Sequence, residues 1–296
     1  MNARALLVAA ILPILIQGAD LKIDHVTVAG MNLDKMEKQL ASVGLHTESG
    51  GPHTNHATQM AISSFPDGSY IELIAPQQNY DAAALGAHQW GKFIQGDAGP
   101  CAWAVRPKFF DAEVARIRAA GVPVKLVDGG RTRPDGTALK WQTADVAGAG
   151  VGVFLPFLIR DETPRQNRAF PGGKPANRDQ SGILRVVIAV SKLSDALERF
   201  GLAYSDAARP LRQVDRKFGA ELAWIADSPV VFAAPLGSDS WVAERIAKFG
   251  EGPIAFVLSG KNKSKESVWG TSQWFGRDLT WFDPRKLGDW WLGVQE

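Results

Sequence analysis

The sequence predicts an α+β fold in which one strand–helix–strand module recurs four times. Short segments with alternating apolar residues are separated by segments in which apolar residues recur at helical spacing, and this order returns along the chain. Residues 23–26 also resemble residues 183–186, and residues 99–103 resemble residues 252–256. Modules one and three are therefore alike, as are modules two and four, which a duplicated two-module domain explains.

The first module begins with a strand and a helix. In the segment 23–28, His25 and its alternate neighbours are expected to point to one face of a sheet, and Asp24 with its own alternates to the other. Asn32 is a suitable N-cap for the following helix, and Gly44 is a suitable stop. The apolar positions of this helix are Leu33, Met36, Leu40 and Val43.

The remaining elements follow from the same patterns. Two further strands of module one, 59–63 and 70–75, are joined by a turn at 66–68, whereas the Gly-Gly-Pro segment at 50–52 predicts a loop. In the later modules the expected strands are 102–105, 139–143, 151–159, 184–190, 253–257, 279–281 and 290–294. The expected helices are 110–120 and a second one that contains Leu193, Leu197 and Phe200 and ends at Gly201.

The N-terminus is typical of a secretory signal peptide. Arg4 precedes a short apolar run, and the small residues Gly18 and Ala19 follow it, so residues 1–19 predict a periplasmic or secreted protein. A buried first helix is the alternative. The predicted domains are a first domain at 20–162, a linker rich in Pro, Gly, Asn and Arg at 163–182, and a second domain at 183–296.

Composition and charge exclude several classes of protein. The 33 basic and 31 acidic residues give a formal net charge of +2, so no strong field recruits nucleic acid or an anionic membrane. No other apolar segment is long enough to cross a bilayer, so stable membrane insertion is not expected. Cys101 is the single cysteine, which excludes an internal disulfide, and its apolar surroundings favour a buried packing role over that of a nucleophile.

Several stretches carry a resemblance to a known superfamily. They are residues 50–53, 70–75 and 131–136, together with Leu139 and Trp141. Most of residues 22–160 thereby resembles the βαβββ units of the vicinal-oxygen-chelate superfamily, and within it the glyoxalase-like domain proteins. The resemblance implies two domains of tandem βαβββ modules whose sheets curve into cups, the second domain being degenerate. It says little about the reaction, because the superfamily includes isomerases, lyases, hydrolases, dioxygenases and drug-sequestering binders.

The resemblance places candidate metal ligands on the first and last strands of a module. His25 and Glu72 match both positions in module one, and either residue is also a candidate for proton transfer. A carboxylate in an apolar strand is costly to bury unless it is paired or bound to a metal, and imidazole with carboxylate suits Zn, Fe, Mn or Ni. An ordinary buried His25–Glu72 pair is the alternative. The corresponding positions elsewhere hold Ala102, Pro156 or Phe157, Arg185 and Val231, which do not complete a metal site.

The other histidines also lie in the first 88 residues. His53 and His56 flank the start of a strand of module one, and either could supply a third metal ligand; ordinary loop positions are the alternative. His46 and His88 are expected at the surface.

Three more residues are candidate substrate contacts. Arg131 and Arg133 are interpreted first as solvated arginines of a hairpin turn, and second as an anion clamp at the rim of the cup. Trp141 is a candidate ligand-stacking or core residue, and Tyr70 alternates with Glu72 on one face of its strand. The candidate substrate contacts are therefore Arg133, Trp141 and Tyr70.

Three functions are compatible with these observations. The first is a divalent-metal-dependent lyase or isomerase that binds a small oxygenated substrate through His25 and Glu72. The second is a metal-free protein of the bleomycin-resistance type that binds or sequesters a small molecule, which the abundant tryptophan favours. The third is a duplicated scaffold for protein contacts. A homodimer is possible in each case.

Overall fold

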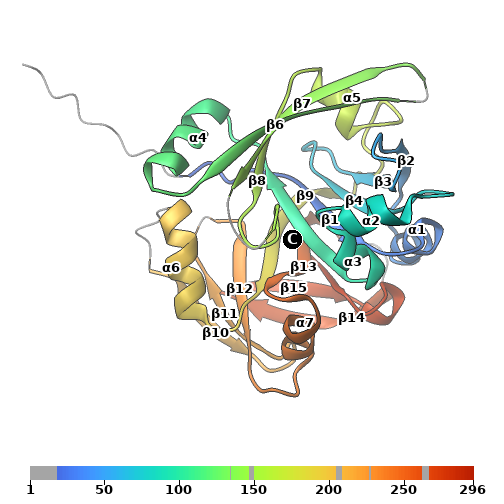
Figure 1. The fold of residues 1–296 in the computed structure, drawn as a ribbon. Coiled ribbons are helices and arrows are strands. Elements are labelled where there is room, and N and C mark those ends of the chain that lie inside the picture. Colours follow the sequence, from blue (N-terminus) through green and yellow to red (C-terminus); the bar gives the residue numbers. More distant parts are fainter. Residues whose placement is uncertain (1–18, 134, 147–149, 205–208, 227, 262–266) are drawn as a thin grey trace, which may run out of the picture.

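The chain folds into two curled sheets of eight strands each, one from each half of the sequence (Figure 1). This computed structural model describes residues 19–133, 135–146, 150–204, 209–226, 228–261 and 267–296. Except for Ala19, the predicted signal peptide lies outside the described residues. In the described part, no helix is long and apolar enough to cross a membrane.

The first sheet has the strand order β2-β3-β4-β1-β5-β8-β7-β6. Its central strands β1 and β5 are antiparallel, and each pairs in parallel with the last strand of its own module, β1 with β4 and β5 with β8. The strand bounds are β1 (Ile23–Ala29), β2 (Glu48–Pro52), β3 (Thr58–Ser64), β4 (Tyr70–Pro76), β5 (Gly99–Val105), β6 (Val124–Thr132), β7 (Ala138–Val146) and β8 (Phe157–Asp161).

The second sheet repeats this topology with the order β10-β11-β12-β9-β13-β16-β15-β14. Again the two first strands, β9 and β13, are antiparallel neighbours at the centre. The strand bounds are β9 (Gln180–Ala189), β10 (Leu211–Asp215), β11 (Ala220–Trp224), β12 (Val230–Pro235), β13 (Gly252–Gly260), β14 (Val268–Trp274), β15 (Arg277–Phe282) and β16 (Trp291–Gln295). Tandem modules of the predicted kind are thereby confirmed.

The helices connect and cover these sheets. Helices α1, α4 and α6 each follow the first strand of a module, whereas α2 with α3, and α7, link the two modules of a half. The helix bounds are α1 (Leu33–Ser42), α2 (Ala82–Ala87), α3 (Gly91–Gln95), α4 (Phe110–Ala119), α5 (Arg165–Ala169), α6 (Leu193–Ala203) and α7 (Trp241–Phe249), with a short 3₁₀ helix η2 (Pro284–Lys286).

Most predicted elements are found, with local differences. The Asn32 side chain caps α1 by accepting from the Lys35 amide, as expected for this residue type. The loop expected at 50–52 is wrong, because this segment belongs to β2 and pairs with β3. Gly201 does not end its helix, since α6 continues to Ala203, and the strand expected at 151–159 begins only at Phe157.

Side-chain alternation gives each sheet one face for a shared core and one face for its own cup. In the first sheet, Val26 and Ile71 belong to a hydrophobic cluster that also contains Val186 of the second sheet. The alternate residues on the other face, such as Ile74 and Phe157, form a separate cluster inside the first cup. The two sheets therefore pack through β1, β5, β9 and β13, and each cup opens away from this core.

The two halves are also joined at the linking helices. Phe93 of α3 stacks on Phe249 of α7 with ring centroids 5.9 Å apart. A Cβ on Gly96 would lie 2.5 Å from the Phe249 ring, so this close approach requires glycine. The Arg245 guanidinium donates a 2.8 Å hydrogen bond to the Pro100 carbonyl of β5. These contacts fix the floor of the first cup against the second half.

An arginine closes the first cup. Strands β2 and β6 are the two edges of the first sheet, yet Arg131 of β6 donates to the carbonyl oxygen of Gly50 in β2. This contact is possible only because the sheet curls until its edges approach. Arg131 is 8% exposed, so the bond is shielded from water. The interpretation of Arg131 as a solvated turn residue is wrong.

We expect Arg131→Met to lower the free energy of unfolding by about 1.5–3 kcal/mol, the usual effect of losing a hydrogen bond from a charged donor. Urea denaturation monitored by tryptophan fluorescence measures this change. Arg212→Met is the matched control, because Arg212 is half exposed and forms only a 3.3 Å surface ion pair with Glu221. Equal effects of the two substitutions would contradict closure of the cup by Arg131.

Candidate functional site

A cavity of about 290 Å³ occupies the first cup. Its polar walls include three imidazoles, His25, His53 and His88, together with the carboxylate of Glu72. Aromatic side chains provide much of the remaining wall, and Arg131 also reaches it. The aromatic residues are Tyr70, Trp90, Trp141 and Phe157.

His25 and Glu72 enter this cavity because their strands are in register. β1 and β4 pair in parallel with His25 opposite Tyr70 and Thr27 opposite Glu72, so His25 and Glu72 are diagonal neighbours on one face. The His25 ring stacks on the Tyr70 ring at 4.8 Å, with the planes 1° apart, and Phe157 meets it edge-on at 5.4 Å. These two contacts fix the plane of the imidazole.

Asp24 lies beside His25 rather than on the opposite face. The β1–β5 register shifts between Ile23 and His25, which leaves Asp24 as the extra residue of a β-bulge. His25 Nδ1 donates to Asp24 Oδ1 over 2.6 Å. The prediction that Asp24 would point away from His25 is wrong, because strict alternation does not hold across a bulge.

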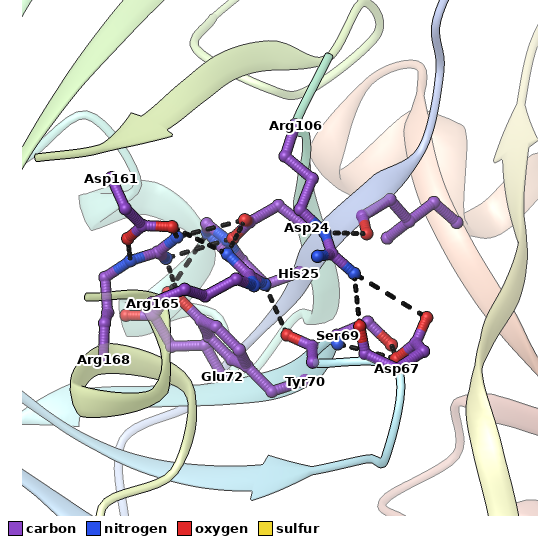
Figure 2. A network of polar contacts seen from close by, with 12 residues as sticks. Asp24, His25, Asp67, Ser69, Tyr70, Glu72, Arg106, Asp161, Arg165 and Arg168 are labelled. Carbon is purple, nitrogen blue, oxygen red and sulfur yellow. Dashed lines mark hydrogen bonds and ion pairs between the residues drawn. The ribbon is translucent and has the colours of Figure 1, made fainter. Parts of the chain in front are cut away.

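A buried charge network surrounds Asp24 (Figure 2). Arg168 of α5 donates to both Asp24 oxygens at 3.0 Å and also to Asp161, and Arg165 donates to Asp24 as well. Arg168 further donates to the Tyr70 hydroxyl at 2.6 Å. Two carboxylates thus face two guanidinium groups, so the charge of the network is balanced.

This network fixes the protonation of its members. Burial alone would raise the pKa of Asp24, but Arg168, the hydrogen bond from His25 and Arg165 together hold that pKa well below its ordinary value of 3.8. Burial raises the pKa of Tyr70, which keeps its hydroxyl protonated. Because a carboxylate only accepts hydrogen bonds, the shared proton of the Asp24–His25 contact belongs to Nδ1. Nε2 of a neutral His25 therefore carries a lone pair.

Glu72 lies between two imidazoles. Its Oε2 is 3.7 Å from His25 Nε2, and its Oε1 is 3.9 Å from His53 Nε2. Glu72 is 7% exposed, and its carboxylate receives no hydrogen bond from the described residues. A carboxylate buried in this way is costly unless a cation, a proton or a ligand joins it.

Two further histidines complete the imidazole group. His53 Nδ1 contacts the Thr58 hydroxyl at 2.8 Å; burial lowers the pKa of His53, and Arg131 adds to this effect, which outweighs the opposing charge of Glu72. His88 accepts a hydrogen bond from the Trp90 amide at Nδ1, and burial also lowers its pKa. Both rings are therefore neutral at pH 7. The prediction that His88 lies at the surface is wrong, because the connection between α2 and α3 carries it into the cup.

The structure brings only part of the predicted site together. His25, Glu72 and His53 meet in the cavity, with Tyr70 and Trp141 in its wall. Trp141 lies directly over β6, where a Cβ on Gly129 would be 2.3 Å from its indole nitrogen. Two residues predicted for the site, His56 and Arg133, do not line this cavity. His56 is exposed and has a φ of 56°.

Arg133 has a structural position instead. It donates to the carbonyl oxygens of Asn167 and Pro171, and it forms a 3.1 Å ion pair with Asp135. Arg133 therefore holds the predicted linker segment, 163–182, against the rim of the cup. That segment contains α5 and the first residues of β9, and α5 supplies the arginines of the Asp24 network. The sequence gives no signal of their pairing with Asp24, which is more than 140 residues away.

The corresponding positions of the other modules are apolar or cationic. The pairing of Ala104 with Phe157 matches the pairing of Thr27 with Glu72, so Phe157 stands at the Glu72 position of module two. In the second sheet the same register puts Val231 at the Glu72 position. Tryptophans fill the second cup, among them Trp274, Trp281 and Trp291. Across the described residues, no group of three or more His, Cys, Asp or Glu side chains is arranged to hold a metal ion.

Comparisons with known proteins agree with this fold. The family model of the glyoxalase-like domain matches residues 23–203. A crystal structure of a hypothetical protein from Staphylococcus aureus is similar over 93% of this chain and 98% of its own, with a TM-score of 0.63 and 14% sequence identity. Methylmalonyl-CoA epimerase from Mycobacterium tuberculosis is 18% identical, covering 40% of this chain and 89% of its own, with a TM-score of 0.32.

No curated protein matches the chain. The structure from Staphylococcus aureus is related over nearly the whole length, but at this identity it supports the fold alone. The family model extends from the start of β1 to the end of α6, which is more than half of the 296 residues. The resemblance to the vicinal-oxygen-chelate superfamily is thereby confirmed, and the chain belongs to its glyoxalase-like domain family.

Proposed function

We propose that the first cup is the active site of a lyase or isomerase that moves a proton on a small oxygenated substrate. One observation carries this proposal: a buried carboxylate, Glu72, faces a cavity between the Nε2 atoms of His25 and His53 without a hydrogen bond from the described residues. Paired titratable groups in a shielded cavity are the usual arrangement for acid–base catalysis. Export is part of the proposal, on the strength of residues 1–19 alone.

Each residue has a distinct part in this reaction. Asp24 holds the Nδ1 proton of His25, so His25 Nε2 is oriented into the cavity as a proton acceptor. Glu72 is near enough to the same position to move a proton on the substrate or to stabilise the imidazolium. Arg131 supplies a positive charge at the wall, suited to a carbonyl or carboxylate oxygen. The aromatic wall excludes water.

The side chains at this site carry the kinds of donor atom that bind a divalent metal ion. His25 Nε2, His53 Nε2 and Glu72 offer two nitrogens and a carboxylate and would hold such an ion; Glu72 lies 3.7 Å from His25 Nε2 and 3.9 Å from His53 Nε2. The three side chains do not yet surround one point, so binding requires them to close in. A bound ion would polarise a substrate oxygen and stabilise an enolate.

A metal-free binding protein is the second candidate. The positions that would supply ligands from module two hold Ala102 and Phe157, and both belong to the apolar cluster of the cup. Trp90 and Trp141 offer flat surfaces for an apolar or aromatic ligand. A protein of this kind would bind such a ligand without changing it.

We expect the purified protein to exchange the proton next to the carbonyl group of a small carbonyl acid in D₂O, as measured by NMR. Glu72→Gln and His25→Ala should each slow exchange by about 10²–10⁴-fold, the range for general acid–base catalysis. His46→Ala is the control, since His46 is an exposed imidazole. Tight binding of pyruvate or methylmalonate with no exchange of either acid would favour the binding protein.

We expect the full chain, dialysed against Zn²⁺, Mn²⁺, Ni²⁺ or Fe²⁺, to retain about one ion per molecule by elemental analysis, as for a single catalytic centre. His25→Ala and Glu72→Ala should lose the ion, because each removes a donor. His46→Ala should retain it. An unchanged metal content in both site variants would refute metal binding in the cup, and the exchange measurement would still test the acid–base proposal.

We expect Asp24→Asn to lower the free energy of unfolding by about 3 kcal/mol at pH 7, because Asp161 alone would then face Arg165 and the buried Arg168. The pKa of Asp24 is lowered by folding, so this contribution is complete above its unfolded value, near 3.8, and disappears as the pH falls through the folded value. Urea denaturation at pH 7 and pH 3 measures the difference.

Asp111→Asn is the control for this substitution. Asp111 forms a 2.7 Å ion pair with Arg160, but its side chain is 78% exposed, so the expected change is at most about 1 kcal/mol. A similar small change for Asp24→Asn would show that the network adds little. A second readout is the ¹⁵N shift of His25, which should report a loss of the Nδ1–H tautomer in Asp24→Asn, because an amide can also donate to Nδ1.

A further inference from the structure

A second, larger cavity lies outside the first cup. Its volume is about 630 Å³, and it is bounded by the start of β9, the C-terminal part of α6 and the turn before β12. The N-terminal residues 19–23 form another side. None of the described residues that line it also lines the first cavity. The proposed lyase or isomerase chemistry therefore does not use it.

Arg185 is the unusual feature of this cavity. The residue is 4% exposed, and its Nη1 atom is buried without a hydrogen-bond partner. Among the described residues, no carboxylate pairs with its guanidinium group, which instead lies 4.3 Å from the centroid of the Trp224 ring. A buried cation without a counter-ion is costly, so the site is built for a negatively charged partner.

The register of the two sheets explains how Arg185 came to this position. Val187 pairs with Val231 as Thr27 pairs with Glu72, so Arg185 stands where His25 stands in the first sheet. The bulge is also repeated, because the β9–β13 register shifts between Ile183 and Arg185, which leaves Leu184 in the position of Asp24. The second copy has replaced the buried Asp–His pair with an apolar residue and a cation.

A second cation strengthens the field. Arg277 lines the same cavity, and its charge adds to burial in lowering the pKa of Arg185 to about 10. Two carboxylates also line the cavity, but Asp20 accepts from the Lys108 and Lys22 amides, and Asp67 accepts from Ser69. Neither carboxylate pairs with Arg185 or Arg277. The two guanidinium groups are therefore available to an anion.

The rest of the wall contains both apolar and polar side chains. Phe200 and Tyr204 of α6 and Pro229 before β12 line it together with Trp224. Besides the two carboxylates and the two arginines, its polar side chains are those of Lys22, Ser228 and Gln295. The wall thus combines two guanidinium groups without a carboxylate partner in the described part of the chain with apolar and aromatic surface, which is the pattern of a site for an ionised headgroup on an apolar body.

We propose that this cavity binds a small organic anion whose carboxylate or phosphate group pairs with Arg185 and Arg277 while its apolar part lies against Trp224 and α6. The planar guanidinium can form two parallel hydrogen bonds to either kind of group. Binding at this site is separate from the chemistry of the first cup, and it does not depend on a metal ion.

Calorimetric titration of the full chain with phenyl phosphate, hexanoate and inorganic phosphate tests the proposal. We expect phenyl phosphate or hexanoate to bind more tightly than inorganic phosphate, because only the first two have an apolar part. Arg185→Met should weaken binding by about ten- to a hundredfold, the range for a lost charge-assisted hydrogen bond. Binding by phenyl phosphate alone would identify a phosphate ligand, and binding by hexanoate alone a carboxylate ligand.

Two further variants make the result decisive. Arg277→Gln alters an exposed side chain, so it should fold normally and still weaken binding severalfold; it decides the question if Arg185→Met does not fold. Arg212→Gln is the control at a surface ion pair and should leave the Kd unchanged. His25→Ala should also leave it unchanged.

Three outcomes would overturn the proposal. The first is that none of the probes binds at millimolar concentration. The second is that Arg185→Met and Arg277→Gln bind a probe as tightly as the natural sequence does. The third is that His25→Ala abolishes binding. The last result would place the probe in the first cup. A further expectation concerns the protein without a ligand: Arg185→Met should melt at the same or a higher temperature, because it removes a buried charge without a partner.

Discussion

The buried carboxylate of Asp24 is the constraint on which the first cup depends. It is wholly inaccessible to solvent, so its charge is tolerable only with Arg165 and Arg168 beside it. Those arginines come from α5, which ties the segment after β8 to the first strand. The same carboxylate orients His25, and Arg168 also holds the Tyr70 hydroxyl. One ion-pair network thus fixes a strand bulge, an imidazole and the ring that stacks on it.

Other arginines determine the shape of the cup by binding backbone carbonyl oxygens. Arg131 joins the two edges of the first sheet, and Arg133 holds the segment after β8 over the rim. Arg106 reaches the carbonyl of Asp67 at the turn between β3 and β4. A guanidinium group suits this task because its several donors can satisfy carbonyl oxygens at strand ends and edges, where the ladder leaves them unpaired. The curled shape is therefore maintained by side chains as well as by sheet twist.

Local patterns in the sequence were sufficient for the sheets and their faces, because period-two alternation places Glu72 and Tyr70 on one side and Ile71 on the other. These patterns were insufficient where contacts between residues far apart in the sequence determine the local structure. The Gly-Gly-Pro segment is a strand because β3 lies beside it and Gly50 leaves room for Met60. The bulge at Asp24 depends on β5 and α5, and His88 reaches the cup only through the fold of the α2–α3 connection.

The two halves show how duplication separates fold from chemistry. The strand order and the bulge in the first strand are the same in both, yet the residues at the corresponding positions differ in kind. In the first half, Asp24 pairs with Arg168 and orients His25, whose Nε2 lies 3.7 Å from Glu72. In the second half, Leu184 and Arg185 replace that pair, Val231 replaces the carboxylate, and tryptophans fill the cup. A cation, Arg185, thus stands in the second half where the first half has an imidazole, which is the difference on which the two separate proposals for the halves rest.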